Sequence, residues 1–195
     1  MPFPKFLYGE YDNEADIGVL VFEDIQPLGY EVVDPDIKRI SSQNRIELVI
    51  STLASFHALC TAFELSLDKT LEETFPFLNT EGNIWFHADM QIYLDEMYNT
   101  CLEFLKSVPG QEETSKWFEQ RMKHPEELQN SQIQGLKTLL HGDLCHNNLF
   151  FKRSCNDNMI LGGWQMCHYG SPATDLCFFL CSSTTTSFRS VNFKL

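Results

Sequence analysis

One short stretch of the chain, HGDLCHNNLFF from His141 to Phe151, places an aspartate and an asparagine five positions apart. They are Asp143 and Asn148. Phosphoryl transfer needs a base that orients and deprotonates the attacking hydroxyl, and oxygen ligands that hold Mg²⁺ against the phosphates of ATP. In the catalytic loop of kinases, the aspartate that acts as the base precedes a metal-binding asparagine by five positions. The spacing therefore predicts a phosphotransfer loop.

The surroundings of this pair favour a catalytic loop over an ordinary turn, in which aspartate and asparagine are also common. The apolar run LKTLL leads into it, and apolar strands on either side of the turn CNDN predict a hairpin after it. That hairpin returns the chain to Gly163, where a second metal ligand is expected. Glycine has no side-chain oxygen to offer Mg²⁺.

Composition excludes several classes of protein. The 195 residues are enough for one domain, or a large part of one, and carry a formal net charge of −13 that would repel a phosphate backbone. We therefore expect no nucleic acid as partner. Prolines interrupt the N-terminus where a secretory signal needs an apolar run, and no run of eighteen apolar residues predicts a membrane span. We expect a soluble cytoplasmic protein that does not act at a membrane.

The seven cysteines are odd in number and irregularly spaced. Free thiols in a reducing compartment are favoured, so we expect no disulfide-linked partner. Cys145–His146 and Cys167–His168 leave a zinc site as an alternative. Neither pair has the spacing that brings two ligands to one tetrahedral ion, and the free-thiol interpretation is preferred.

Periodicity predicts an α+β domain. The run IGVLVFEDI, residues 17–25, reads as a strand entering a loop, and apolar steps of three and four predict a helix from about Asp36 to Phe63. On its apolar face, His57 is interpreted as a structural core histidine. A second helix is expected within residues 87–107, and a less regular one over 112–134, with a break near His124–Pro125.

Several separate motifs resemble one family. HGDLCHNNLFF is similar to the catalytic loop of the choline-kinase and aminoglycoside-phosphotransferase superfamily, and GGWQM occupies the place of its Asp-aromatic-Gln metal segment. YGSPATDLCFFL resembles the Gly-Ser-Pro-x-x-Asp-Leu segment that follows. VLVFEDI is similar to the strand that enters the adenine-binding hinge, and LASFHAL to the helix behind it. The ordered set most resembles the CHK kinase-like, or ecdysteroid kinase-like, branch.

The resemblance implies a protein-kinase-like fold, mostly the helical C-terminal lobe with the last strands of a truncated N-terminal lobe. Residues 1–30 would be the remnant of the small lobe and hinge, and residues 31–195 the large lobe. It further implies Asp143 as catalytic base, Asn148 as a Mg²⁺ ligand, and the backbone of Glu23, Asp24 and Ile25 as the ATP hinge. His141 and Asp175 would support the catalytic loop, although Asp175 also reads as a plain helix N-terminal acid.

The family's activity would be ATP-dependent phosphorylation of a hydroxyl on a small molecule, with a steroid as one candidate. Gly163 stands where the family has its main metal-binding aspartate, and neither a phosphate loop nor a lysine with its helix-borne glutamate precedes the hinge. We therefore expect weak or no activity. The alternative is a non-catalytic pseudokinase that binds a small ligand or a protein.

Overall fold

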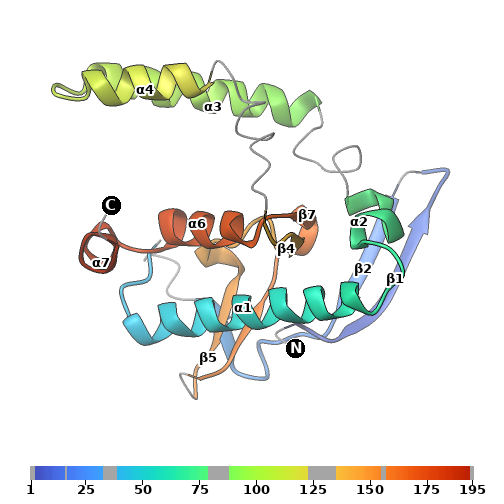
Figure 1. Cartoon of the computed structure of the whole chain (residues 1–195). Coiled ribbons are helices and arrows are strands. Elements are labelled where there is room, and N and C mark those ends of the chain that lie inside the picture. The colour runs from blue at the N-terminus through green and yellow to red at the C-terminus, as the bar shows by residue number, and fades with distance from the viewer. Residues whose placement is uncertain are drawn as a thin grey trace.

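Helices and short strands form a mixed α+β arrangement (Figure 1). The computed structural model describes residues 3–15, 17–32, 39–78, 88–122, 135–154 and 157–193. Its strands are β1 (Phe6–Asp12), β2 (Ile17–Phe22), β3 (Tyr30–Val32), β4 (Thr138–Leu140), β5 (Leu149–Lys152), β6 (Met159–Leu161) and β7 (His168–Gly170). Its helices are α1 (Gln43–Leu65), α2 (Leu71–Thr74), α3 (Ala88–Ser107), α4 (Glu112–Met122), α6 (Pro172–Ser183) and α7 (Thr186–Asn192), with 3-10 turns η1 (Pro76–Leu78), η4 (His146–Asn148) and η5 (Trp164–Met166).

The core forms where the apolar stripe of α1 meets the strands and α6. Ile46, Val49, Leu53 and Phe56 are buried on one face of α1, at the three- and four-residue steps expected from the sequence. They belong to one cluster with buried side chains of β5, β6, α6 and the loop before β5: Leu144, Leu149, Phe151, Met159, Leu161 and Phe179. The predicted amphipathic helix is therefore confirmed on these positions.

The start of this helix was predicted wrongly. It begins at Gln43 after Ser42, not at about Asp36, and it ends at Leu65. Ile40 instead forms an isolated parallel bridge to Thr184, in which its amide donates to the Ser183 carbonyl at 2.6 Å. Burial of Ile40 beside the end of α6 holds this segment in an extended form. Residues 36–38 lie outside the described part of the chain.

By length and composition alone, α1 is apolar enough to cross a membrane. The run contains charged Arg45, Glu47 and Glu64, and its most apolar face packs into the core. A core helix of a soluble protein passes the same test, so the property is weak support for a membrane span.

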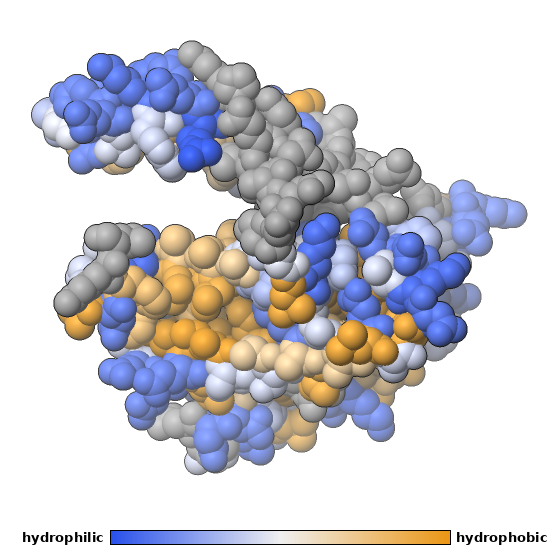
Figure 2. All heavy atoms as spheres, in the orientation of Figure 1, coloured by the Kyte–Doolittle hydropathy of each residue, from blue (hydrophilic) through white to orange (hydrophobic). Residues whose placement is uncertain are grey.

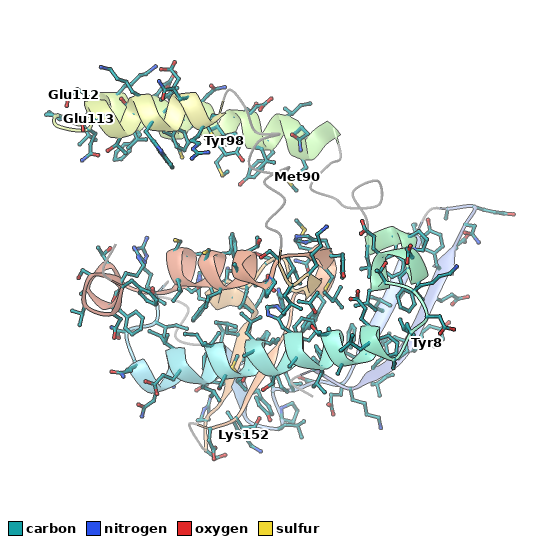
Figure 3. The ribbon with its side chains drawn as sticks, in the orientation of Figure 1. Tyr8, Met90, Tyr98, Glu112, Glu113 and Lys152 are labelled. Atoms are coloured by element: carbon teal, nitrogen blue, oxygen red, sulfur yellow. The ribbon has the colours of Figure 1, made fainter. Side chains whose placement is uncertain are left out.

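The helices α3 and α4 form a hairpin that stands apart from the other elements in Figure 1. They pack against each other through Tyr98, which Figure 3 labels, and Phe118, whose ring centroids are 6.4 Å apart, and through Lys106 and Glu119. The helix expected within residues 87–107 is confirmed as Ala88–Ser107. Of the third expected helix, the part from Glu112 to Met122 is confirmed, and its remainder, with the predicted break at residues 124–125, lies outside the described residues.

The predicted hairpin is confirmed as β5 and β6, which pair antiparallel with Phe150 opposite Ile160. A third strand, β3, extends the sheet on the other edge of β5, and its Tyr30 lies opposite Lys152. A separate antiparallel pair joins β4 to β7. The sequence did not indicate β7, because its three residues, His168 to Gly170, are too few for a period-two pattern.

The hairpin of β1 and β2 is exposed along its whole length. The expected strand is confirmed as Ile17–Phe22, which ends before Glu23, and its partner β1 was not expected. Register places Tyr8, Val19 and Val21 on one face and Leu20 and Phe22 on the other, so both faces carry large apolar side chains. Figure 2 shows a second apolar area over α6. Phe178 of α6 is among the exposed large apolar side chains. Exposed apolar area of this kind favours association.

This contrast in burial predicts effects of very different size for two leucines that both lie in strands. Leu20 is 69% exposed and Leu161 is fully buried. Leu161→Ala should lower the free energy of unfolding by about 2 to 5 kcal/mol because it leaves a cavity, whereas Leu20→Ala should change it by less than about 0.5 kcal/mol. Urea unfolding followed by circular dichroism measures both. Leu20→Lys should also reduce the concentration-dependent light scattering of the chain. If Leu20→Lys and the unaltered chain scatter equally, the β1–β2 surface has no role in association.

Candidate functional site

The loop between β4 and β5 holds the two residues on which a phosphotransfer site would depend. Asp143 follows β4 closely, and Asn148 ends the turn η4 just before β5. The Nδ2 of Asn148 donates to the Asp143 carboxylate Oδ2 at 2.9 Å and to the Asp143 backbone oxygen at 2.7 Å. The sequence spacing therefore brings the two side chains together, as expected. Donation by Nδ2 leaves the other amide atom, Oδ1, as the one free to act as a ligand.

Gly163 lies directly against this amide. It follows β6 with a left-handed φ of 74° and caps the turn η5. A Cβ atom built on it would stand 2.3 Å from Asn148 Oδ1. The expected meeting of Asn148 with Gly163 is therefore observed, and the contact is too close for any side chain at position 163 while Asn148 keeps this rotamer.

The buried side chain of His141 holds the loop between β4 and β5 in place. Its ring is fully buried, its Nε2 donates to the Gly162 carbonyl at 2.8 Å, and its Nδ1 accepts from the Asp143 amide at 3.2 Å. This pattern fits a neutral imidazole with the proton on Nε2. Burial lowers the pKa of His141 below its ordinary value of 6.5, an effect partly opposed by its bond to Gly162 and by the nearby charges of Asp175 and Asp143. The neutral form is thus the one that the fold selects.

Asp175 is buried in the first turn of α6 and joins three elements. Its carboxylate accepts from the amides of His141 and Gly142 at 2.8 and 2.9 Å, and it lies 3.0 Å from Nε2 of His57 on α1. Burial raises the pKa of Asp175, but these hydrogen bonds together outweigh it, so the net pKa is lowered. Asp175 therefore occupies both places considered for it, the helix N-terminal turn and the support of the loop.

His57 is buried with its ring 5.5 Å from that of Phe56, and its side chain meets Asp175. The structural interpretation of this histidine agrees with that geometry. Its particular partner could not be read from the sequence, because residues 57 and 175 are separated by 118 positions. Trp164 was also missed as a site residue. Its ring packs against His141 with centroids 4.4 Å apart.

The proposed hinge residues form the turn between β2 and β3. The Glu23 amide donates to the Lys5 carbonyl at 2.9 Å, and the Asp24 carboxylate accepts from the Gln26 amide at 3.0 Å. The Ile25 carbonyl accepts from the Tyr30 amide at 3.2 Å. These bonds hold the turn that leads from the exposed hairpin to the three-stranded sheet. Binding of a nucleotide by these residues stays a prediction.

The described residues do not fit a magnesium site of the kinase type. Asn148 Oδ1 and the Asp143 carboxylate are the oxygens at hand, and Gly163 adds none where a carboxylate is required. Within the described ranges, no group of three or more His, Cys, Asp or Glu side chains is placed to hold a metal. The group left to do chemistry is the Asp143 carboxylate, which the Asn148 amide holds in place on the loop.

Protonation of His141 should loosen this loop. Because its pKa is lowered in the folded chain, the unfolded chain takes up the proton first, and stability is lost as the pH falls below about 6.5. Asp175 adds a further loss below its ordinary value of 3.8. The free energy of unfolding should therefore fall between pH 7 and pH 5, by up to about 1.4 kcal/mol per pH unit for one proton.

His141→Gln should lower stability at pH 7 and reduce that slope, because it removes the titrating ring. His146→Gln, in the same loop, is the matched control and should keep the slope of the unaltered chain. Urea unfolding at several pH values gives both quantities. If the free energy of unfolding falls with pH equally steeply in the unaltered chain and in His141→Gln, His141 is not the titrating group.

Comparison with known proteins identifies the family of the chain. The family model described as the ecdysteroid kinase-like family matches residues 2–195. No curated protein and no solved structure matches the chain. Because the family match extends over nearly all of the sequence and includes the loop from His141 to Asn148, the chain belongs to the ecdysteroid kinase-like family.

Proposed function

We propose that the chain is a degenerate small-molecule phosphotransferase of this family, with weak or no catalytic activity. Family membership supports the general class, a kinase-like phosphotransferase acting on small molecules. The observation that carries the proposal is the Asn148 amide, which donates to the Asp143 carboxylate and presses its Oδ1 against Gly163. Asp143 and Asn148 lie together, and glycine stands at the position where the resemblance implies a second carboxylate.

In this proposal Asp143 is the base that accepts the proton of an acceptor hydroxyl. The Asn148 Nδ2 orients its carboxylate, and the His141 ring holds its backbone amide. Asp175 fixes the start of the loop through two further amides. A base held in this way keeps its position without reorganisation as the hydroxyl approaches, which is a large part of what a kinase supplies.

Kinases of this kind generally use ATP and Mg²⁺. The charge on the transferred phosphoryl group is neutralised chiefly by metal, so loss of a carboxylate ligand removes much of what lowers the barrier. The acceptor would be a small hydroxylated molecule, with a steroid as one candidate, and the site of action the cytoplasm. Glu23 to Ile25 would receive the adenine.

The second candidate function is a non-catalytic pseudokinase that binds a small ligand or a protein. The contact between Gly163 and Asn148 favours it, because the space that a metal-binding side chain would need is already filled. Affinity for Mg-ATP separates the two candidates. A phosphotransferase must bind it, whereas a binding module need not.

We expect negligible phosphate transfer from ATP to a panel of hydroxylated small molecules, including steroids. Labelled phosphate on the acceptor is the quantity to measure, with Asp143→Asn as the matched variant. Asp143→Asn preserves size and removes the base, so it should not lower a rate that is already at background. Robust transfer by the unaltered chain that disappears in Asp143→Asn would contradict the degenerate interpretation.

Restoring the carboxylate with Gly163→Asp should improve Mg²⁺ binding, and the side chain at position 163 should carry a structural cost. The new Cβ requires Asn148 to turn away, and the left-handed φ strains any residue other than glycine. Gly163→Ala is the control, because it introduces the same Cβ without a ligand. We expect both variants to lose about 1 to 3 kcal/mol of stability, and Gly163→Asp alone to recover stability when Mg²⁺ is added. Equal responses to Mg²⁺ in the two variants would exclude position 163 as a metal position.

A further inference from the structure

A cluster of aromatic rings connects Phe3, which precedes β1, with the loop that carries Asp143. Phe3 is partly buried against the core, and the centroid of its ring lies 4.6 Å from that of Trp164 in an edge-to-face arrangement. Phe56 of α1 completes the cluster, with its ring 5.0 Å from Trp164 and 5.9 Å from Phe3. The ring of Trp164 also lies 4.4 Å from that of His141. Trp164 is therefore the ring that contacts both Phe3 and His141.

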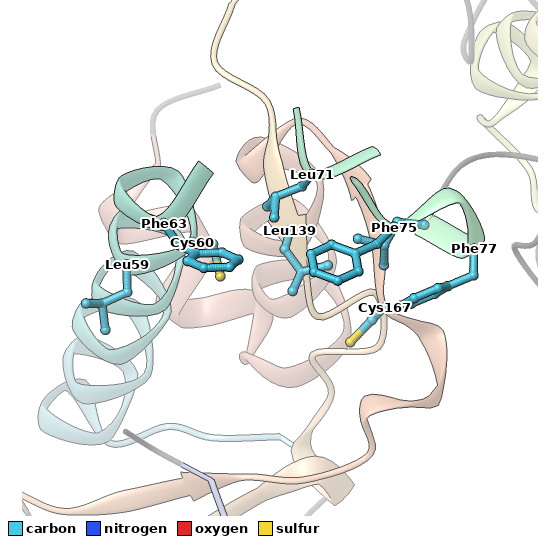
Figure 4. Close-up of a pocket in the computed structure, with 9 residues that line it drawn as sticks. Leu59, Cys60, Phe63, Leu71, Phe75, Phe77, Leu139 and Cys167 are labelled. Atoms are coloured by element: carbon cyan, nitrogen blue, oxygen red, sulfur yellow. The ribbon is translucent and has the colours of Figure 1, made fainter. Parts of the chain in front are cut away.

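The turn η5, which begins at Trp164, is packed unevenly. The Nε1 of Trp164 donates to the Leu161 carbonyl at 2.9 Å, which ties the ring to the end of β6. The turn is followed by Cys167, which borders an apolar cavity of about 360 Å³. Figure 4 shows Cys167 at one wall of this cavity and Phe63 of α1 at another. Atoms that border open space gain few packing contacts, so the position of η5 depends on the rings around Trp164.

The contact of Trp164 reaches Asp143 through His141. The Nδ1 of His141 accepts from the Asp143 amide at 3.2 Å, and its Nε2 donates to the Gly162 carbonyl at 2.8 Å. Both bonds require the imidazole to keep one orientation, and the Trp164 ring packs against that imidazole. A shift of Trp164 would therefore weaken the hydrogen bond that holds the backbone of Asp143.

The segment that carries Phe3 is itself fastened at a second point. The Lys5 amide donates to Glu23 Oε1 at 2.8 Å, and the Glu23 amide donates to the Lys5 carbonyl at 2.9 Å. Phe3 and Glu23 also line one surface pocket of about 500 Å³. Residues 3–5 therefore connect the turn at Glu23 with the aromatic cluster.

We propose that Phe3 is a positioning residue of the candidate site, which holds the Trp164 ring against His141 and thereby fixes the backbone of Asp143. It acts through Trp164 and not by its own contact with the reacting groups. Only the role of Asp143 as a base rests on the proposed function. The geometric effect of Phe3 exists whether or not the chain transfers phosphate, so its test uses neither ATP nor an acceptor.

The quantity to measure is hydrogen exchange of the Asp143 amide, followed by NMR and divided by the exchange rate of the β5–β6 ladder amides in the same variant. This ratio separates local loosening of the loop from a general loss of stability. Phe3→Ala should raise it roughly two- to tenfold, the factor that corresponds to one aromatic contact. Phe3→Tyr keeps the ring and should leave the ratio unchanged.

Phe188→Ala is the matched control. Phe188 is also partly buried against the same core, but its ring packs on Phe193, with centroids 6.2 Å apart. Its loss should lower the free energy of unfolding without changing the exchange ratio of Asp143. Phe3→Leu replaces Phe3→Ala if the alanine variant does not fold, and it should raise the ratio in the same direction.

The route through Trp164 is tested by a double-mutant cycle. In a Trp164→Leu background the contact is already lost, so Phe3→Ala should raise the exchange ratio less than about twofold further. An equal increase in both backgrounds would show that Phe3 does not act through Trp164. An unchanged ratio in Phe3→Ala, or the same rise in Phe188→Ala, would also overturn the proposal, and none of these outcomes depends on whether phosphate transfer is detected.

Discussion

The buried carboxylate of Asp175 is the interaction on which the site depends. It accepts hydrogen bonds from the amides of His141 and Gly142 at the start of the loop and lies against His57 of α1, so three parts of the chain share one side chain. A buried charge is tolerated when each of its oxygens is hydrogen-bonded, and here both are. The loop cannot move away from α1 or α6 without exposing this charge to an apolar interior. The packing of α1 and α6 in the core therefore determines the geometry of this loop.

The same rigidity explains why the site is poorly suited to a metal. His141 and Asp175 hold the backbone on both sides of Asp143, and Asn148 is in turn held by Asp143. The amide of Asn148 thereby fills the space that a Cβ atom at position 163 would need. Only Asp143 and Asn148 therefore offer side-chain oxygens here, and position 163 adds none.

Local features of the sequence were sufficient to predict the proximity of Asp143 and Asn148, the hairpin after them and the buried face of α1. Each depends on residues close in sequence, such as Asp143 with Asn148 or Ile46 with Val49. The prediction failed where distant parts of the chain decide the outcome. Ile40 is extended because it bridges to Thr184, so α1 begins later in the sequence, at Gln43. The short strand β7 forms because it pairs with β4. The His57–Asp175 contact could not be inferred from spacing for the same reason.

The three-stranded sheet has a consequence for the order in which the chain folds. The β5–β6 hairpin closes a short loop, but β3 joins β5 across a much longer one, as the contact of Glu31 with Arg153 at a separation of 122 residues shows. Closing so long a loop costs entropy before any contact repays it, and pairings of this range slow folding. The hairpin can form early and locally, within microseconds to tens of microseconds by the usual scale. The loop that precedes it gains its final shape only when α1 and α6 have closed around it, so the site is completed in one of the last steps of folding.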